Sequence, residues 1–308
     1  MKRLLFLMGI LLPLAGYCQN SDTSSTRKKL TTTAPFLGGV SVSDMVTSVN
    51  TNGNTFTIQQ PIADIGFPVY KDFSTGHPLL IKAGIRYQGL YLSGEENIGG
   101  NAFHSITVPL LLNYSFSQTT SISFVGVATA GSDFKQNIDA NDILYTVGIR
   151  LGFRPSKSFR YGVTLAYMSN YTGKFILPLP DIDWAISDKL SFAGIIPARA
   201  SLKYKLSASQ SFGVTASLNG SMYRLNEGAT DQYIHLRQSS GGLIYDLKLA
   251  RRWKLNLIAG RTFSQRLETF NLDQKVSFNG FTKLNDRIAN ISYRQNSFLF
   301  QGGLSYEF

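Results

Sequence analysis

The chain has 308 residues, with 30 lysines and arginines against 19 acidic residues and a formal net charge of +11. Its mean hydropathy is close to zero, although it contains 15 tyrosines and 21 phenylalanines. Beyond the first few residues, no apolar run approaches the roughly 20 residues of a membrane helix, which excludes a helical membrane protein. A single cysteine excludes a disulfide-stapled domain. The basic surplus leaves nucleic acid, anionic lipid and anionic solutes as classes of partner.

The amino-terminal residues have the parts of a secretory signal. Lys2 and Arg3 precede an apolar run over 4–14, which is too short to span a bilayer as a helix. This pattern predicts a signal peptide over residues 1–18, cleaved after Cys18. Lipidation of Cys18 is the alternative, but a tyrosine precedes it where that signal needs a small residue. Export favours lipid and anionic solutes over nucleic acid as partners.

Residues 19–35 are rich in serine and threonine and contain few apolar side chains. This composition predicts a flexible periplasmic leader. The basic cluster Arg27, Lys28 and Lys29 could contact anionic lipid head groups, but a solvated tail is the simpler interpretation.

From residue 36 onward, apolar and polar residues alternate in segments separated by turn residues, which is the pattern of strands with one apolar face. The segment 145–153 is a good example, because every second residue is aromatic or aliphatic. Prolines predict local distortion near 61–68 and 178–180. We predict strands near 36–46, 55–70, 79–92, 103–116, 122–131, 143–154, 159–170, 174–186, 190–197, 199–206, 212–224, 233–250, 252–267 and 288–308.

The connections alternate between short and long, as in a transmembrane antiparallel up-and-down β-barrel with short periplasmic turns and longer extracellular loops. Short ones are predicted at 72–76, 117–121, 154–158, 187–189, 207–211 and 250–252. Long ones are predicted at 47–54, 93–102, 132–142, 225–232 and 268–287. A tight turn at Pro197 keeps the alternation of sides. The all-β domain then covers residues 36–308 with about 14 strands, and 12 is the alternative.

The last segment carries a second signal. Phe298, Phe300, Leu304, Tyr306 and Phe308 share one strand face. The final eight residues resemble the carboxy-terminal signal that outer-membrane β-barrels present to the barrel assembly machinery. The resemblance is carried by the polar, glycine, hydrophobic and terminal aromatic positions, which are Gln301, Gly303, Tyr306 and Phe308. It implies an assembly route and a compartment.

In an internal stretch, a proline-marked strand over 175–180 is followed by Trp184, by Ile195-Ile196-Pro197 and by Tyr204. This stretch resembles a family of uncharacterised Gram-negative outer-membrane β-barrels, a domain of unknown function. The resemblance implies a barrel in the outer membrane and brings no activity with it.

Basic residues dominate the polar face of the predicted strands, with few acidic residues among them. The deepest are Arg86, Arg150 and Lys203, which we expect to act as an electrostatic filter for anions in a water-filled lumen. The alternative is that they pair with aspartate or glutamate inside a plugged lumen.

An enzyme is a less favoured hypothesis. Ser169 and Asn170 match part of the His-X-Ser-Asn motif of outer-membrane lipid hydrolases, but Tyr167 replaces the histidine, and a phenol is a poor base at neutral pH. His235 and Ser239 lie about 13 Å apart along a strand, which is too far for a catalytic pair. The three histidines are scattered, so we expect no metal site and no cofactor.

The sequence therefore predicts a porin-like passive channel for small, anionic solutes in the outer membrane of a Gram-negative bacterium. Expected partners are outer-membrane lipid, lipopolysaccharide and the barrel assembly machinery, and not nucleic acid. The alternative is a non-conducting envelope barrel that binds a partner through its loops. A lipid hydrolase is the third and least favoured function.

Overall fold

The computed structural model describes residues 38–308 except for 52–53, 75, 139, 227–230 and 277–286. The predicted signal peptide and leader lie outside the described residues. In the described part, no helix is long and apolar enough to cross a membrane.

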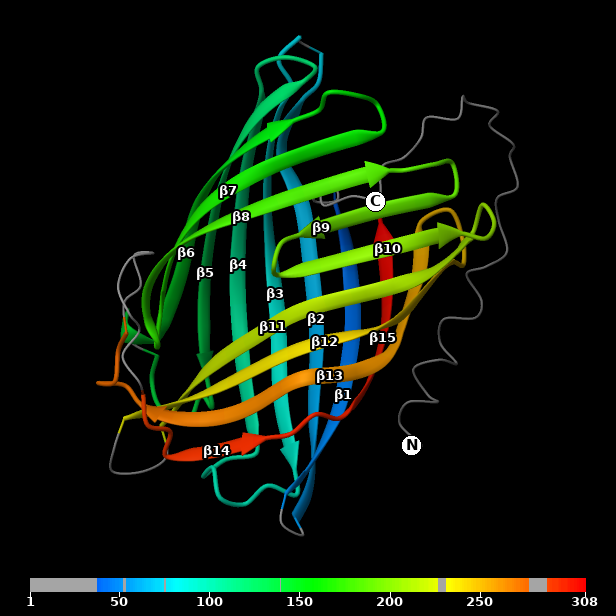
Figure 1. Cartoon of the computed structure of the whole chain (residues 1–308). Helices are drawn as coiled ribbons and strands as arrows, with labels where there is room; N and C mark the ends of the chain where they lie inside the picture. Colours follow the sequence, from blue (N-terminus) through cyan, green and yellow to red (C-terminus); the bar gives the residue numbers. More distant parts are fainter. Residues whose placement is uncertain (1–37, 52–53, 75, 139, 227–230, 277–286) are drawn as a thin grey trace.

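The described residues form one antiparallel sheet with a single 3-10 turn, η2 (Ala140–Asp142). Each strand except β15 pairs in the sheet with the strand that precedes it in the chain (Figure 1). The strands are β1 (Gly39–Thr51), β2 (Asn54–Asp72), β3 (Leu79–Ser93), β4 (Ala102–Ser115), β5 (Thr120–Ser132), β6 (Ile143–Phe153), β7 (Phe159–Asn170), β8 (Gly173–Ala185), β9 (Leu190–Ile195), β10 (Arg199–Lys205), β11 (Gln210–Leu225), β12 (Gln232–Lys248), β13 (Trp253–Asn271), β14 (Ile291–Arg294) and β15 (Phe298–Glu307).

The sheet closes on itself because β15 pairs with β1 on one edge and with β13 on the other. Strand β14 pairs only with the end of β13, so the closed wall has 14 strands and the predicted barrel is confirmed. The single strand predicted over 288–308 is divided between β14 and β15. The cause is local, because the backbone N–H and C=O of Ser297 both bond to Thr262 in place of a regular ladder.

The strand faces alternate as the sequence predicts. Val147 and Ile149 on β6 are about half exposed on the outer surface, and so are Val163 and Leu165 on β7. Arg150, also on β6, points into the barrel instead and is mostly buried. An apolar outer belt around a polar interior is the arrangement of a transmembrane barrel, in which lipid covers the outer face.

The two ends of the barrel differ. We call the end where Gly39 pairs with Glu307 the terminal end, and the opposite one the distal end. Connections at the terminal end are all short, namely 73–78, 116–119, 154–158, 186–189, 206–209 and 249–252. Those at the distal end are 52–53, 94–101, 133–142, 171–172, 196–198, 226–231 and 272–290. The long loop predicted at 47–54 is wrong, because β1 and β2 stay paired as far as Thr51 and Asn54.

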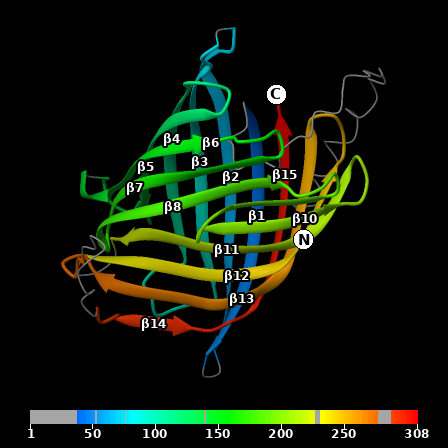
Figure 2. The same ribbon diagram turned by 45° about the horizontal axis from the view of Figure 1, so that its top comes forward.

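The distal halves of β11, β12 and β13 leave the wall and fold across the mouth of the barrel (Figures 1 and 2). We call residues 219–225, 232–240 and 262–271, together with β14, the infolded sheet. Strand β11 pairs with β10 only as far as Ser217, and its Arg224 then aligns with Ser132 of β5 on another part of the wall. A register shift between β12 and β13 at Ser239 marks the bend, since bulges kink a sheet.

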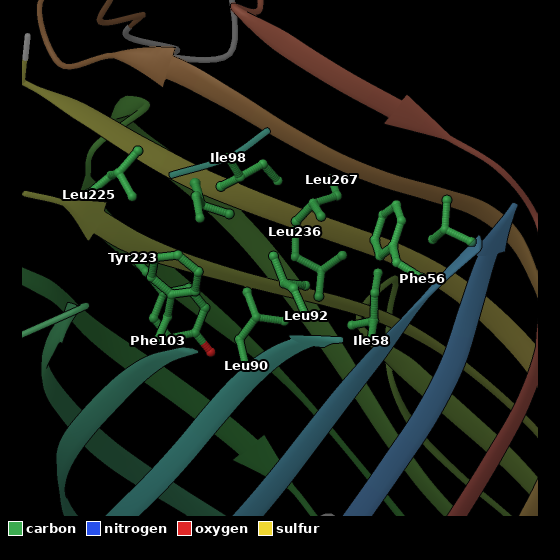
Figure 3. Packing of buried hydrophobic residues seen from close by; sticks show 12 residues of the cluster. Phe56, Ile58, Leu90, Leu92, Ile98, Phe103, Tyr223, Leu225, Leu236 and Leu267 are labelled. Atoms are coloured by element: carbon green, nitrogen blue, oxygen red, sulfur yellow. The ribbon is translucent and has the colours of Figure 1, made fainter. Parts of the chain in front are cut away.

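An apolar cluster closes the space between the infolded sheet and the β1–β4 wall (Figure 3). We call it the distal seal. Its members are Val49, Phe56, Ile58, Leu90, Leu92, Ile98 and Phe103 on one side and Tyr223, Leu225, Ile234, Leu236 and Leu267 on the other. Burying each large apolar side chain is worth about 1.5–3 kcal/mol, so the seal is a substantial part of the stability of this end.

Candidate functional site: the barrel lumen

The three predicted filter residues all face the lumen, and each one contacts an aspartate. Their roles as a filter stay a prediction. The contacts are Arg86 Nε to Asp64 Oδ1 at 2.5 Å, Arg150 to Asp181 through two bonds of 2.7 Å, and Lys203 Nζ to Asp246 Oδ2 at 2.6 Å. Half of the Arg86 side chain remains exposed, against about a fifth of Arg150 and Lys203. Arg86 is therefore the predicted residue most open to a passing solute.

The Arg150–Asp181 pair depends on a glycine between them. The two residues lie on β6 and β8, so the guanidinium has to cross β7. It does so over Gly162, where an added Cβ would lie only 2.6 Å from Nη2 of Arg150. The bidentate geometry favours a strong, oriented bond. The Arg150–Asp181 ion pair thus links β6 to β8 on the lumen side of the wall.

Two further ion pairs brace the lumen toward the terminal end. Arg160 contacts the fully buried Asp183 at 2.9 Å, and Lys254 contacts Glu307. The sequence showed the basic residues but not their partners. Strand alternation could have identified these aspartate partners, because Asp181 and Asp183 occupy inward-facing positions of β8.

Two lumen cations, Lys82 and Arg199, have no acidic partner within ion-pair distance in the part of the chain that the structure describes. Lys82 is buried and borders a cavity of about 370 Å³ that Asp64 and Arg86 also line. Arg199 is exposed at the start of β10 and shares the inward parity of Lys203. Lys82 lies at an inward position of β3, and Arg199 was not predicted because it directly follows the turn at Pro197.

A layer of amides lies beneath the distal seal. Gln60 on β2 donates to Gln238 on β12 at 2.9 Å, and Gln238 donates to Gln265 on β13 at 3.2 Å. All three side chains are buried. Buried polar groups with partners specify one arrangement of the surrounding walls, so this layer holds the infolded sheet in register.

The residues considered for lipid hydrolysis are placed differently from a catalytic pair. Ser169 pairs with Tyr145, which is on the outer face. The Asn170 side chain accepts bonds from the backbone N–H groups of Thr172 and Gly173, so it caps the β7–β8 turn. Among the described residues, no group of three or more His, Cys, Asp or Glu could hold a metal ion.

The four residues of the carboxy-terminal signal lie on or directly after β15, the strand that closes the barrel. Gln301 and Gly303 are paired with β1, and the ring of Tyr306 packs 5.0 Å from Trp253. The backbone N–H of Phe308 bonds to Gly38. Their role in assembly stays a prediction.

The chain is similar to known proteins in family and in fold. A family model described as "Domain of unknown function (DUF6268)" matches residues 105–307. No curated protein matches the sequence significantly.

Among solved structures, the COG4313 outer membrane channel from Pseudomonas putida F1 is 11% identical with a TM-score of 0.45, over 89% of this chain and 97% of that one. The KdgM porin in complex with disordered oligogalacturonate is 11% identical with a TM-score of 0.34, over 87% and 99%. The P. putida toluene transporter TodX is 8% identical with a TM-score of 0.36, over 87% and 88%. The similarity is one of barrel fold, and each name describes the other protein.

Proposed function

The chain belongs to the DUF6268 family, whose description assigns no activity, and from the barrel itself we propose a channel for small solutes with a preference for anions. The observation that carries the proposal is the positive charge left in the lumen after its acids are paired. Lys82 and Arg199 have no acidic partner among the described residues, and Arg86 is half exposed. Cations lining a pore favour anions.

The proposed location is the outer membrane of a Gram-negative bacterium. The short turns and the ends of the barrel domain lie in the periplasm, and the distal end lies outside, as in other outer-membrane barrels. Lipid and lipopolysaccharide surround the apolar belt. The barrel assembly machinery reads the signal formed by Gln301, Gly303, Tyr306 and Phe308 on the closing strand.

Transport is passive, and the distal seal is its gate. With the seal closed, an ion that enters from the terminal end meets an apolar barrier. With the seal parted, the solute passes Arg86, Lys82 and Arg199. Asp64, Asp181 and Asp246 offset the charges of Arg86, Arg150 and Lys203. Arg150 and Lys203 contribute less to selectivity than Arg86, because only about a fifth of each side chain is exposed, against half of Arg86.

The test is single-channel recording of refolded protein in a planar bilayer under a salt gradient. We expect a reversal potential on the anion side that moves toward zero in the Lys82→Ser/Arg86→Ser double variant. Lys157→Ser removes an exposed charge from the β6–β7 turn and is the matched control. An unchanged reversal potential in the double variant would contradict the filter.

A second function has its own observation. The distal seal and the ion pairs also suit a non-conducting envelope barrel whose distal loops bind a partner. Absence of any opening from heat-modifiable, folded protein, including variants with a weakened seal, would favour this scaffold over the channel.

A further inference from the structure

The described strands of the barrel wall lack pairing on one side of its distal half. Strands β9 and β10 form a short hairpin between the longer β8 and β11 (Figure 1). β9 pairs with β8 only over Asp181–Ala185, and β10 ends its pairing with β11 at Ser217. Among the described residues, no strand pairs with 174–179 of β8 on this side or with 219–221 of β11 on the facing side.

The opening is triangular. Its base is the β9–β10 turn, where two strands end, so the backbones of β8 and β11 stand about 14 Å apart at a strand spacing of about 4.8 Å. Its apex is where Thr172 Oγ1 approaches Met222 Sδ at 3.9 Å. The free edge 174–179 is about 20 Å long at about 3.3 Å per residue. We call this opening the side portal.

Proline chemistry fits a free edge at this place. The backbone C=O of Pro180 accepts a bond from Ile196, so the backbone groups of residue 180 face β9. Pro178 has the same parity and therefore faces the side portal, where its missing N–H leaves no donor unsatisfied. The distortion predicted at 178–180 is wrong, because β7 and β8 stay paired in regular register through both prolines.

Both faces of this edge are apolar, which breaks the alternation seen elsewhere. On the outside, Ile176 and Pro178 are exposed. On the lumen side, Phe175, Leu177 and Leu179 are partly exposed, and register places Leu177 opposite Ala166 of β7. An aqueous pore needs no such lining, but a solute with an apolar body does.

The outer surface next to the side portal also contains an apolar hollow. Where the infolded sheet bends inward, the wall recedes and leaves a hollow of about 900 Å³. It begins at Ala200 and Ala216, next to the turn. Glycines, alanines and phenylalanines make up most of its lining. A lipid-dissolved apolar molecule would find a preformed recess there.

A cation stands at the foot of the side portal on its lumen side. Arg199 directly follows the turn and pairs in register with Ile195 and Ser217. It is exposed and has no acidic partner in the described part of the chain. An exposed guanidinium beside an apolar lining matches a molecule with a carboxylate at one end.

We infer that the side portal admits small amphipathic carboxylates between the bilayer and the lumen, with the apolar body on Phe175, Leu177 and Leu179 and the carboxylate on Arg199. The inference rests on the proposed channel and names its solute class and route. The distal seal closes the axial route, so the side portal is the way in on this side of the barrel.

The first test asks whether lipid reaches the lumen face of β8. A fluorophore is attached to Leu177→Cys in a Cys18→Ser background, and the protein is placed in nanodiscs containing lipids with nitroxide-labelled acyl chains. Leu165→Cys, on the outer face of β7, is the lipid-exposed reference, and Thr129→Cys, which faces the lumen from β5, is the shielded one. We expect quenching at Leu177 to match the lipid-exposed reference. Quenching as low as at Thr129 would overturn the portal.

Blocking the side portal tests its position. An added Cβ at Gly220 meets only one backbone oxygen at 3.7 Å, so the Cβ of Gly220→Phe has room, and its ring lies on a face of the sheet next to the free edge of β11. Gly126→Phe on β5 also enters open space and is the matched control. We expect the first variant, and not the second, to reduce quenching at Leu177→Cys. Equal quenching in both variants would place the lipid contact elsewhere.

The solute class is tested with 4-phenylbutyrate, which should protect Leu177→Cys from a maleimide. Loss of a charge-assisted bond in Arg199→Gln should weaken this protection about 10- to 100-fold, with partial rescue in Arg199→Lys. Protection by uncharged 4-phenylbutanol should not change. Equal protection by 4-phenylbutyrate with and without Arg199 would overturn the carboxylate site.

Conductance separates this inference from the proposed function. Anion-selective openings with no lipid quenching at Leu177 would support the proposed channel and overturn the side portal. Lipid quenching and protection by 4-phenylbutyrate without any channel opening in conductance recordings would support the side portal and overturn the ion channel.

Discussion

Weakening the distal seal should open the barrel. Leu90 and Leu236 lie on its two sides and are 0% and 1% exposed. A buried leucine replaced by alanine loses about 2–5 kcal/mol of packing free energy. If opening the gate breaks the same contacts, each replacement raises the open fraction about 30- to 4,000-fold. The effects of the pair should not add fully, because the two residues share one cluster.

The assay is open probability in planar bilayers for Leu90→Ala, Leu236→Ala and the double variant. Heat-modifiable migration on gels checks that each barrel is folded. Leu165→Ala, on the lipid-facing surface, is the control and should leave open probability unchanged. Folded double variant with wild-type open probability would refute the seal as a gate. So would a wild-type protein that is already open continuously.

Three further predictions concern the polar contacts. Asp181→Asn should leave Arg150 uncompensated and move the reversal potential further toward the anion side. It should also lower the free energy of unfolding in urea by less than the about 3–5 kcal/mol lost on breaking a fully buried pair, because Arg150 is partly exposed to the lumen. An unmoved reversal potential would argue against this prediction. Gly162→Val should displace the Arg150 guanidinium, which an added Cβ would approach to 2.6 Å, and wild-type selectivity and stability would contradict this. Arg224→Gln should free the tip of the infolded sheet from Asp142, bonded at 2.6 Å, so that hydrogen exchange speeds up in the distal half of β11 and not in its terminal half.

Strand positions were predictable because lipid imposes a period of two on every strand of a barrel. The segments predicted over 143–154 and 159–170 end within one residue of β6 and β7. Alternation also placed Arg86, Arg150 and Lys203 on the lumen side. It could not identify their partners. The Arg150–Asp181 pair spans three strands and depends on the missing side chain of Gly162.

The infolded sheet was not predicted. The sequence does contain a sign of it, because some lumen-facing positions in the distal halves of the strands are apolar. These are Ile58, Leu90, Ile234 and Leu236, which would face water in an open pore. The local sequence pattern shows that these apolar side chains must be buried, but it does not show which distant part of the barrel buries them. The bend also depends on a register shift, which composition does not encode.

The shortness of β9 and β10 has a consequence for the surrounding membrane. These strands have six and seven residues, whereas a tilted transmembrane strand needs about 9–11 to cross the hydrocarbon layer. Hydrophobic mismatch of this kind is relieved by thinning of the bilayer, at a fraction of a kcal/mol per Å. We therefore expect the lipid annulus to thin only in part along this sector of the barrel, so that acyl chains still reach the side portal beyond the β9–β10 turn. This gives the barrel a preferred direction in the membrane plane, along which two such thinned sectors can merge and share their cost.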